Sequence, residues 1–374
     1  MLFADIIGQQ VTINHLRHTV KENRISHAQL LLGGEGYGAL PLALAFAQYL
    51  MCQNRSETDA CGTCAACRKV AKYQHPDLHF VFPVIPDKTN DIPVSDKYIA
   101  PWRQFILKEP YGTYTEWMAA LNAEKTQGLI RAEEGREIIR KLSMKSFEAE
   151  YKIMIIWYPE KMNAEAGNKL LKLIEEPPEK TLFFLVAENS EFILNTILSR
   201  TQLIKIGRIS EDALFVALKN RFQLNDEKAR QIARISDGNY VQAKEYINSS
   251  VDTQQNYDNF IQMMRLSYAG KIPEMIAWVD EVAKLGRERQ KAFLAYSLRM
   301  VRENLVLNQK QKQMARLSAD ETSFAERFST YIHPANCGLL QQELDKAFMH
   351  IARYANAKVV FLDLCFKQNR LLRL

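Results

Sequence analysis

Four of the six cysteines lie close together in the sequence, in the spacing C-x8-C-x2-C-x2-C. They are Cys52, Cys61, Cys64 and Cys67. Four thiolates in so short a segment can close a tetrahedron around Zn²⁺, and a complete thiolate set is typical of a structural site. An iron–sulfur cluster uses the same ligands, and unmetallated thiols are a third interpretation. Because nothing else in the sequence indicates electron transfer, we predict a structural zinc ion.

The remaining cysteines and two nearby histidines fit no second metal site. Cys337 and Cys365 are isolated in the sequence, and we expect them to be buried thiols. His75 and His79 follow the cysteine group closely, but four cysteines leave them no vacancy on the metal. We therefore expect both histidines to be packing or hydrogen-bonded residues.

A glycine-rich segment follows a short apolar run, and its spacing is that of a phosphate-binding loop. Its glycines include Gly33, Gly36 and Gly38. A working loop continues with a lysine for the outer phosphates and a hydroxyl for magnesium, but Ala39 and Leu40 occupy those places. We predict that this chain binds no ATP.

A second catalytic element is also missing. Nucleotide hydrolases of this class carry acidic residues at the end of the third strand, where they hold magnesium and polarise water. Here Trp157 and Tyr158 follow the apolar run 153–156. Two disabled elements in matching places indicate a domain that keeps the ATPase architecture without ATP turnover. A plain glycine turn is the simpler alternative, and an active ATPase would need the missing side chains.

The elements that must position these residues alternate along the first 207 residues. Apolar runs at 29–33, 78–82, 152–157, 182–187 and 202–206 predict buried strands, and helical spacing at 11–24, 40–51, 132–142 and 164–176 separates them. This alternation predicts an α/β fold with a doubly wound parallel sheet covered on both faces. Beyond residue 207, only helical spacing is found.

The chain of 374 residues is long enough for several domains. We predict an α/β domain over 1–207, a small helical unit over 208–250 and an all-α domain over 251–374. The polar stretch from about 83 to 128 lacks clear periodicity, and we interpret it as an insertion. Balanced charges favour a solvated surface excursion, while four aromatic residues offer a way to pack it onto the domain. These are Trp102, Tyr111, Tyr114 and Trp117.

Composition excludes other classes of protein. The apolar stretch at 39–51 is too short for a membrane span, and the sequence lacks a secretory signal pattern, so we expect a cytoplasmic protein without membrane contact. The net charge of +6 arises within residues 201–374. It favours an interface or solubility role over a DNA footprint.

Several motifs together resemble the delta-prime family of subunits of the bacterial DNA polymerase III clamp loader. Beside the cysteines, they are residues 3–10 (FADIIGQQ), 27–28 (HA), 75–77 (HPD), 168–178 (NKLLKLIEEPP) and 196–201 (TILSRT). The resemblance covers most of the first 207 residues. It implies an AAA+ module, a helical lid and a C-terminal helical collar that oligomerises the subunit.

The resemblance also implies a role for Ser199 and Arg200. They match the Ser-Arg-Cys motif of clamp-loader subunits, with Thr201 in place of the cysteine. In the family this arginine acts in trans on ATP bound by a neighbouring subunit. Outside this context, a surface arginine in an ion pair is the simpler interpretation. Val241 stands where active relatives carry a nucleotide-sensing arginine, which is a third loss of nucleotide chemistry.

The implied partners are the ATPase subunits and delta, reached through the collar and the Arg200 face, with the sliding clamp and primed DNA in the same complex. Lys169 and Lys172 could face DNA or form an ordinary solvated face. The alternative from another class is a free-standing zinc-containing nucleic-acid-binding protein. The balanced charges around the cysteines argue against it.

Overall fold

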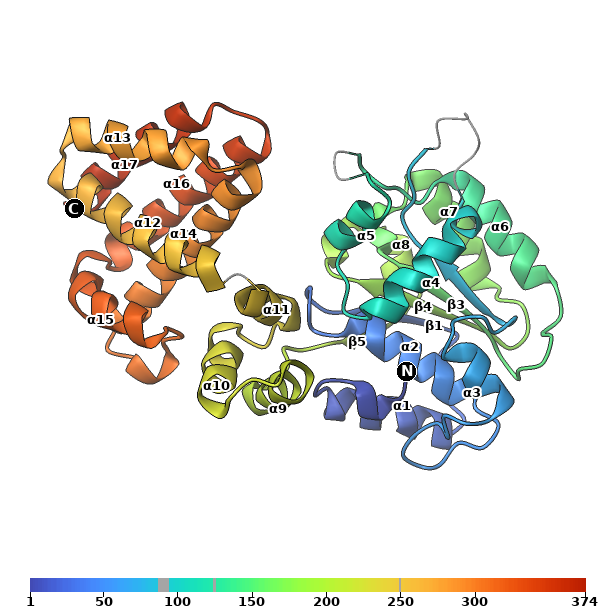
Figure 1. Cartoon of the computed structure of the whole chain (residues 1–374). Helices are drawn as coiled ribbons and strands as arrows, with labels where there is room; N and C mark the ends of the chain where they lie inside the picture. Colours follow the sequence, from blue (N-terminus) through green and yellow to red (C-terminus); the bar gives the residue numbers. More distant parts are fainter. Residues whose placement is uncertain (87–93, 124–125, 249) are drawn as a thin grey trace. The chain divides into compact units, whose positions relative to one another are not determined.

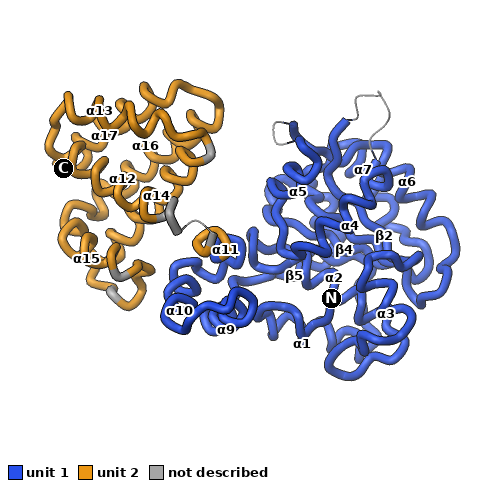
Figure 2. The backbone as a smooth tube through the Cα atoms, in the orientation of Figure 1, with its two compact units in different colours: residues 1–243 blue, residues 244–374 orange. Residues whose placement is uncertain are grey.

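The computed structural model describes residues 1–86, 94–123, 126–248 and 250–374. The chain divides into two compact units, Met1–Ala243 and Lys244–Leu374 (Figures 1 and 2). The predicted three-part division places a boundary near residue 250, whereas the compact units meet within helix α11 (Tyr240–Asn248). A separate lid and collar therefore remain a prediction.

The first unit is built around a five-stranded sheet in the order β2-β3-β4-β1-β5. The strands are β1 (Ala28–Leu32), β2 (Leu78–Val81), β3 (Lys152–Trp157), β4 (Thr181–Ala187) and β5 (Gln202–Lys205). Every pairing is parallel, and the register aligns Leu31 of β1 with Val186 of β4 and Ile204 of β5. The carboxyl ends of all five strands consequently lie at one edge of the sheet.

Helices cover both faces of this sheet, which confirms the predicted doubly wound α/β class. Side chains alternate along β3, so that Ile153 and Ile155 enter one apolar cluster while Met154 and Ile156 enter the other. The first cluster includes residues of α1 (Gln10–Lys21) and α2 (Ala39–Met51). The second includes residues of α6 (Ala132–Ser143), α7 (Ala164–Glu175) and α8 (Asn195–Leu198).

The insertion is packed onto the domain, so its interpretation as a solvated excursion is wrong. Its described part forms α4 (Ile99–Lys108) and α5 (Tyr114–Ala120), while residues 87–93 and 124–125 lie outside the described chain. Trp102 and Trp117 are fully buried, and the Trp117 indole donates to the Pro83 carbonyl at 2.8 Å. The balanced charges suggested a solvated segment, but its buried aromatic side chains determine where the segment lies.

Three helices follow the sheet: α9 (Glu211–Phe222), α10 (Asp226–Ile235) and α11. Ser210 and Asn225 cap the first two by accepting hydrogen bonds from backbone N–H groups at the helix starts. The part of α11 up to Ala243 belongs to the first unit. These residues therefore share one compact body with the glycine loop.

The second unit is helical throughout its described residues. Its longer helices are α12 (Ser250–Ala269), α13 (Ile272–Lys284), α14 (Arg287–Asn308), α15 (Ala319–Phe328), α16 (Pro334–Ala352) and α17 (Ala357–Leu371). An apolar cluster joins them, and Cys337 and Cys365 are buried within it as predicted. No helix in the described ranges is both long and apolar enough to cross a membrane.

Candidate functional site: a closed glycine loop, a four-cysteine group and Arg200

The glycine loop joins β1 to α2, in the strand–loop–helix arrangement that the sequence predicts. Gly36 and Gly38 adopt φ angles of 76° and 95°, which lie in the left-handed region that favours glycine. Gly38 is the N-cap of α2, and Ala39 begins the helix. The loop therefore turns through two glycines directly before the helix, and Ala39 and Leu40 begin that helix.

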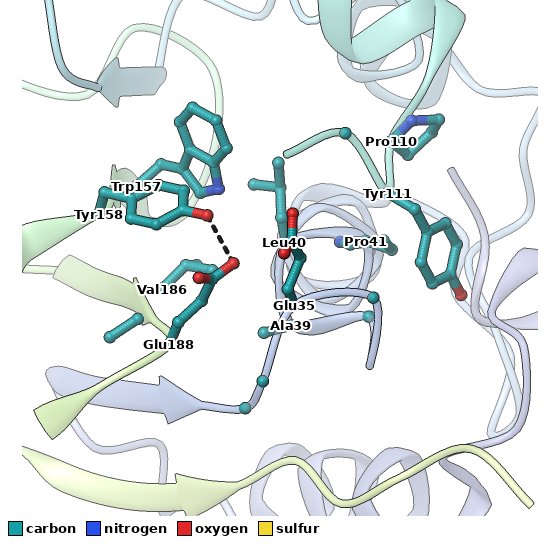
Figure 3. Close-up of a pocket in the computed structure, with 16 residues that line it drawn as sticks. Glu35, Ala39, Leu40, Pro41, Pro110, Tyr111, Trp157, Tyr158, Val186 and Glu188 are labelled. Atoms are coloured by element: carbon teal, nitrogen blue, oxygen red, sulfur yellow. Dashed lines mark hydrogen bonds between the residues drawn. The ribbon is translucent and has the colours of Figure 1, made fainter. Parts of the chain in front are cut away.

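Apolar side chains pack beside the glycine loop. Leu40 is 4% exposed, and Trp157 and Tyr158 at the end of β3 are 3% and 6% exposed. The cavity that remains between the loop and these residues measures about 40 Å³ (Figure 3). Ligand pockets usually measure roughly 300–1,000 Å³, so this cavity is small in comparison.

Two glutamates border the cavity. Glu35 and Glu188 line it, and the Tyr158 hydroxyl donates a hydrogen bond to the Glu188 carboxylate (Figure 3). Burial raises the pKa of Glu188, and burial together with this carboxylate raises the pKa of the Tyr158 phenol. A working phosphate loop offers a lysine here, whereas this one offers carboxylates.

Tyr111 of the insertion closes the loop from another side. A Cβ atom at Gly38 would lie 3.0 Å from the Tyr111 ring, so ring and loop are in close contact. The buried Tyr111 hydroxyl accepts a hydrogen bond from the Ile7 N–H at 2.9 Å. The rings of Tyr111 and Tyr240 lie 4.8 Å apart, and the Arg221 guanidinium stands over both.

The start of α11 holds the same loop through the backbone. The Tyr240 N–H donates to the Gly36 carbonyl at 3.2 Å. A Cβ at Gly36 would lie only 2.0 Å from Asn239 Oδ1, so this position requires glycine for space as well as for its φ angle. Val241, which we predict to stand at the place of a sensor arginine, is buried. The glycine loop is therefore in direct contact with the start of α11.

The four clustered cysteines come together as predicted. Their Sγ atoms all lie within 4.8 Å of one another, and those of Cys61 and Cys67 are 4.0 Å apart. Four thiolates about 2.3 Å from a tetrahedral zinc lie roughly 3.8 Å from one another, so the group fits a zinc ion with a small contraction. Cys64 is the N-cap of the short helix α3 (Ala65–Val70), and its sulfur accepts from the Cys67 N–H.

Backbone hydrogen bonds prepare the sulfurs for a cation. The N–H of Cys61 donates to Cys52 Sγ at 3.2 Å, and the N–H of Cys64 donates to Cys61 Sγ at 3.4 Å. Hydrogen bonds from backbone N–H groups lower the pKa of Cys61 to about 6. Burial instead raises the pKa of Cys52 and of Cys67. A bound dication would favour the thiolate form at all four positions.

Neither histidine belongs to the cysteine group, in agreement with the prediction. Burial lowers the pKa of His79 to about 4, and it lowers the pKa of His75. His75 Nδ1 accepts a hydrogen bond from the Asp77 N–H at 3.2 Å. The Asp77 carboxylate accepts hydrogen bonds from the backbone N–H groups of residues 147–149, so the 75–77 motif holds that loop in place.

Arg200 lies just after α8, near the carboxyl end of α7. Its Nε is 2.5 Å from a Glu175 carboxylate oxygen, and Nη1 donates to the Thr196 carbonyl and to Ser199 Oγ. Both side chains of the ion pair remain about two-fifths exposed. The arginine is thus partly accessible on the surface and held by a pair that solvent screens.

The two lysines of α7 differ in their surroundings. Lys169 Nζ donates to the Ala132 carbonyl and to Glu165, so it is held against α6. Lys172 is exposed. The idea that both lysines face DNA therefore stays a prediction, with Lys172 the more available of the pair.

The sequence did not indicate that Tyr111 and Glu188 lie beside the glycine loop. Glu188 follows a predicted strand, and in a parallel sheet it must lie at the same edge as the glycine loop, so the topology could have indicated it. Tyr111 stands in a segment without periodicity. No local signal connects it to the loop.

Residues 8–210 match the family described as "DNA polymerase III, delta subunit". The DNA polymerase III subunit gamma of Buchnera aphidicola subsp. Acyrthosiphon pisum (strain APS) is 24% identical over 78% of this chain and 70% of its own length. The DNA polymerase III subunit delta' of Bacillus subtilis (strain 168) is 28% identical over 53% of this chain and 47% of its own length. The match thus spans about half of that delta-prime relative.

A further delta-prime subunit, from Yersinia pestis, is 29% identical over 53% of this chain and 44% of its own length. Among solved structures, a gamma-subunit-related protein of Thermotoga maritima aligns over 96% of this chain and 99% of its own, at 13% identity and a TM-score of 0.43. That score is too low to support an argument.

Proposed function

This chain belongs to the DNA polymerase III delta-subunit family and is delta-prime-like, and from this premise we propose that it is a clamp-loader subunit that does not hydrolyse ATP. The observation that carries the proposal is the closed glycine loop. Its cavity of about 40 Å³ is bordered by carboxylates and lacks a lysine. The chain keeps the architecture of a nucleotide site and places its own side chains there.

The catalytic contribution of the chain is Arg200, supplied to ATP on a neighbouring subunit. A guanidinium can neutralise charge on the transferring phosphoryl group, and such arginines accelerate hydrolysis by about 10³–10⁵. The ion pair with Glu175 does not prevent this role, because an exposed pair contributes only about 0.2–1 kcal/mol. Releasing Arg200 toward a phosphate therefore costs little compared with what the finger provides. Ser199, which accepts from Nη1, orients the guanidinium.

The four clustered cysteines would hold a structural Zn²⁺, which supplies a cross-link rather than a reaction step. Asp59, between the first two ligands, accepts hydrogen bonds from the backbone N–H groups of Phe3 and Ala4 at 3.1 and 3.0 Å. The cysteine segment thereby also fastens residues 3–4. We assign the site to stability of the first unit.

The partners we propose follow from the family. The helices of residues 251–374 would form the collar contact with ATPase subunits and delta, and the assembled complex would act on the sliding clamp and primed DNA. A free-standing zinc-containing nucleic-acid-binding protein is not favoured, because family membership accounts for the α/β unit as well as for the cysteines.

The test is the Arg200→Ala variant in a clamp loader reconstituted with its ATPase subunits. We expect the variant to assemble and to unfold within about 1 kcal/mol of the parent, since only an exposed ion pair is lost. We expect DNA- and clamp-stimulated ATP hydrolysis at the neighbouring site to fall at least about a hundredfold. Arg200→Lys should recover little, because an ammonium lacks the planar fork.

Arg136→Ala serves as the matched control, since it removes an exposed arginine from the same unit. It should leave hydrolysis unchanged. Equal rates in the parent and the Arg200→Ala complex would refute the role of the arginine. ATP turnover by the purified chain alone would refute the proposal that it does not hydrolyse ATP.

A further inference from the structure

A basic groove lies on the first unit, away from the glycine loop and from Arg200. It runs between α1 and the segment that follows α2, and its volume is about 540 Å³. Its charged lining residues are Arg17, Lys21, Arg55 and Glu57. We propose that this groove binds the phosphates of a DNA backbone. The choice of DNA rests on the proposed function, whereas the preference for phosphate rests on the groove itself.

Arg17, on the α1 side, is held in a defined orientation. Its Nε donates to the main-chain carbonyl of Glu57 at 2.6 Å, and Nη1 donates to Asn14 Oδ1 at 3.3 Å. A guanidinium has five N–H donors, so these two bonds leave further donors for a ligand. An arginine that is already oriented loses less side-chain entropy when it binds.

Arg55, on the opposite side, is held in a similar way. Its Nη1 donates to the Leu50 carbonyl at 3.3 Å, and its guanidinium lies 5.8 Å from the centroid of the Tyr49 ring. The Tyr49 hydroxyl donates to the Ser56 carbonyl at 3.0 Å, which ties this side of the groove together. Two oriented guanidinium groups therefore line one groove.

The charge balance of the groove favours an anion. Three cationic side chains stand against one carboxylate, that of Glu57. The carboxylate is 3.8 Å from Lys21 Nζ, and both side chains are more than 70% exposed. Solvent screens such a pair strongly, so it neither fixes Lys21 nor cancels the field of the arginines. A ligand with several negative charges gains from all three cations.

Phosphate suits these donors better than other anions. The planar fork of arginine pairs with two phosphate oxygens at once, and a backbone with regularly spaced phosphates can reach both arginines. The three cationic side chains can pair with the phosphates of any sequence. We therefore expect binding that depends on salt and not on sequence.

The test measures binding of the full chain to fluorescently labelled single-stranded and double-stranded oligonucleotides by anisotropy at several salt concentrations. The variant Arg17→Gln/Arg55→Gln should bind about tenfold more weakly at low salt, with a log–log salt slope smaller by about 1.5–2. Arg17→Lys/Arg55→Lys keeps the charge but lacks the planar guanidinium, so its affinity should lie between that of the parent and that of the double glutamine variant. Unchanged zinc content and urea midpoint would show that the variants fold.

Lys108→Gln/Arg136→Gln removes the same charge from exposed positions elsewhere in the unit and should retain parental binding. If this control lost as much DNA affinity as Arg17→Gln/Arg55→Gln, the groove would not be the binding site. A parent chain that binds no DNA would also overturn the proposal. Polyglutamate competing as well as DNA would overturn the preference for phosphate. Inorganic phosphate displacing DNA far better than chloride of equal ionic strength would identify a free-phosphate site instead. None of these outcomes bears on the Arg200 test, so the two proposals fail separately.

Discussion

Tyr111 joins three parts of the first unit, and its replacement tests whether the glycine loop is closed by protein contacts. The ring is 4% exposed and contacts Gly38 and Tyr240, while the hydroxyl accepts from the Ile7 N–H. Tyr111→Phe removes only the acceptor. Tyr111→Ala removes the ring as well.

The two variants separate the energies of these contacts. Leaving the buried Ile7 N–H without a partner costs about 1–3 kcal/mol, which is the expected loss in Tyr111→Phe. Truncating a buried aromatic ring costs about 3–5 kcal/mol through lost transfer energy and the cavity left behind. Because the neighbouring rings can partly relax, we expect Tyr111→Ala to lose about 4–6 kcal/mol in total.

Urea unfolding followed by tryptophan fluorescence measures these losses, since three of the four tryptophans, Trp102, Trp117 and Trp157, lie in the first unit. Native-state hydrogen exchange should in addition show faster exchange across the loop residues 33–38 in Tyr111→Ala. Phe147→Ala, a truncation at a side chain that is 80% exposed, should cost under about 0.5 kcal/mol. If Tyr111→Ala cost no more than Phe147→Ala, the closed loop would not depend on the insertion.

Two further predictions concern stability. Cys64→Ser should release zinc, which atomic absorption measures, and should destabilise the first unit by several kcal/mol. Cys337→Ala, the control, should retain the metal. A parent protein that is fully stable without metal would contradict the assignment. Burial raises the pKa of Glu134 from 4.5 to about 7, so the native state holds a proton that the unfolded chain has released, and stability should fall between those pH values. Glu134→Gln should therefore be more stable than the parent by about 2–3 kcal/mol at pH 8 but not at pH 4, and a pH-independent difference would contradict this reasoning.

The predictable part of the fold is the part with local periodicity. The apolar runs at 152–157 and 182–187 correspond to β3 and β4, and the predicted helices 132–142 and 164–176 end within a residue of α6 and α7. Because these segments are buried on defined faces, the spacing of their apolar residues predicts their secondary structure. The insertion could not be predicted in the same way, because Trp102 packs against Phe82, which directly follows β2, and against Trp157 of β3, both outside its own segment.

The candidate site divides similarly. The cysteine group was predictable because its ligands lie within sixteen residues and share one chemistry. The lack of a lysine and a hydroxyl at positions 39 and 40 can also be read directly from the sequence. The contacts around the glycine loop depend on Tyr111, Glu188 and Asn239, which only the folded chain brings to the loop.

The strand order has a consequence for synthesis of the chain. The central strand β1 pairs with β4 and β5, which occupy residues 181–187 and 202–205. At about 5–20 residues per second, a ribosome needs on the order of ten seconds or more to deliver these partners after residues 28–32. Throughout that interval both edges of an almost wholly apolar strand stay unpaired. Aggregation of the nascent chain is therefore governed by how β1 is shielded before residue 205 has emerged.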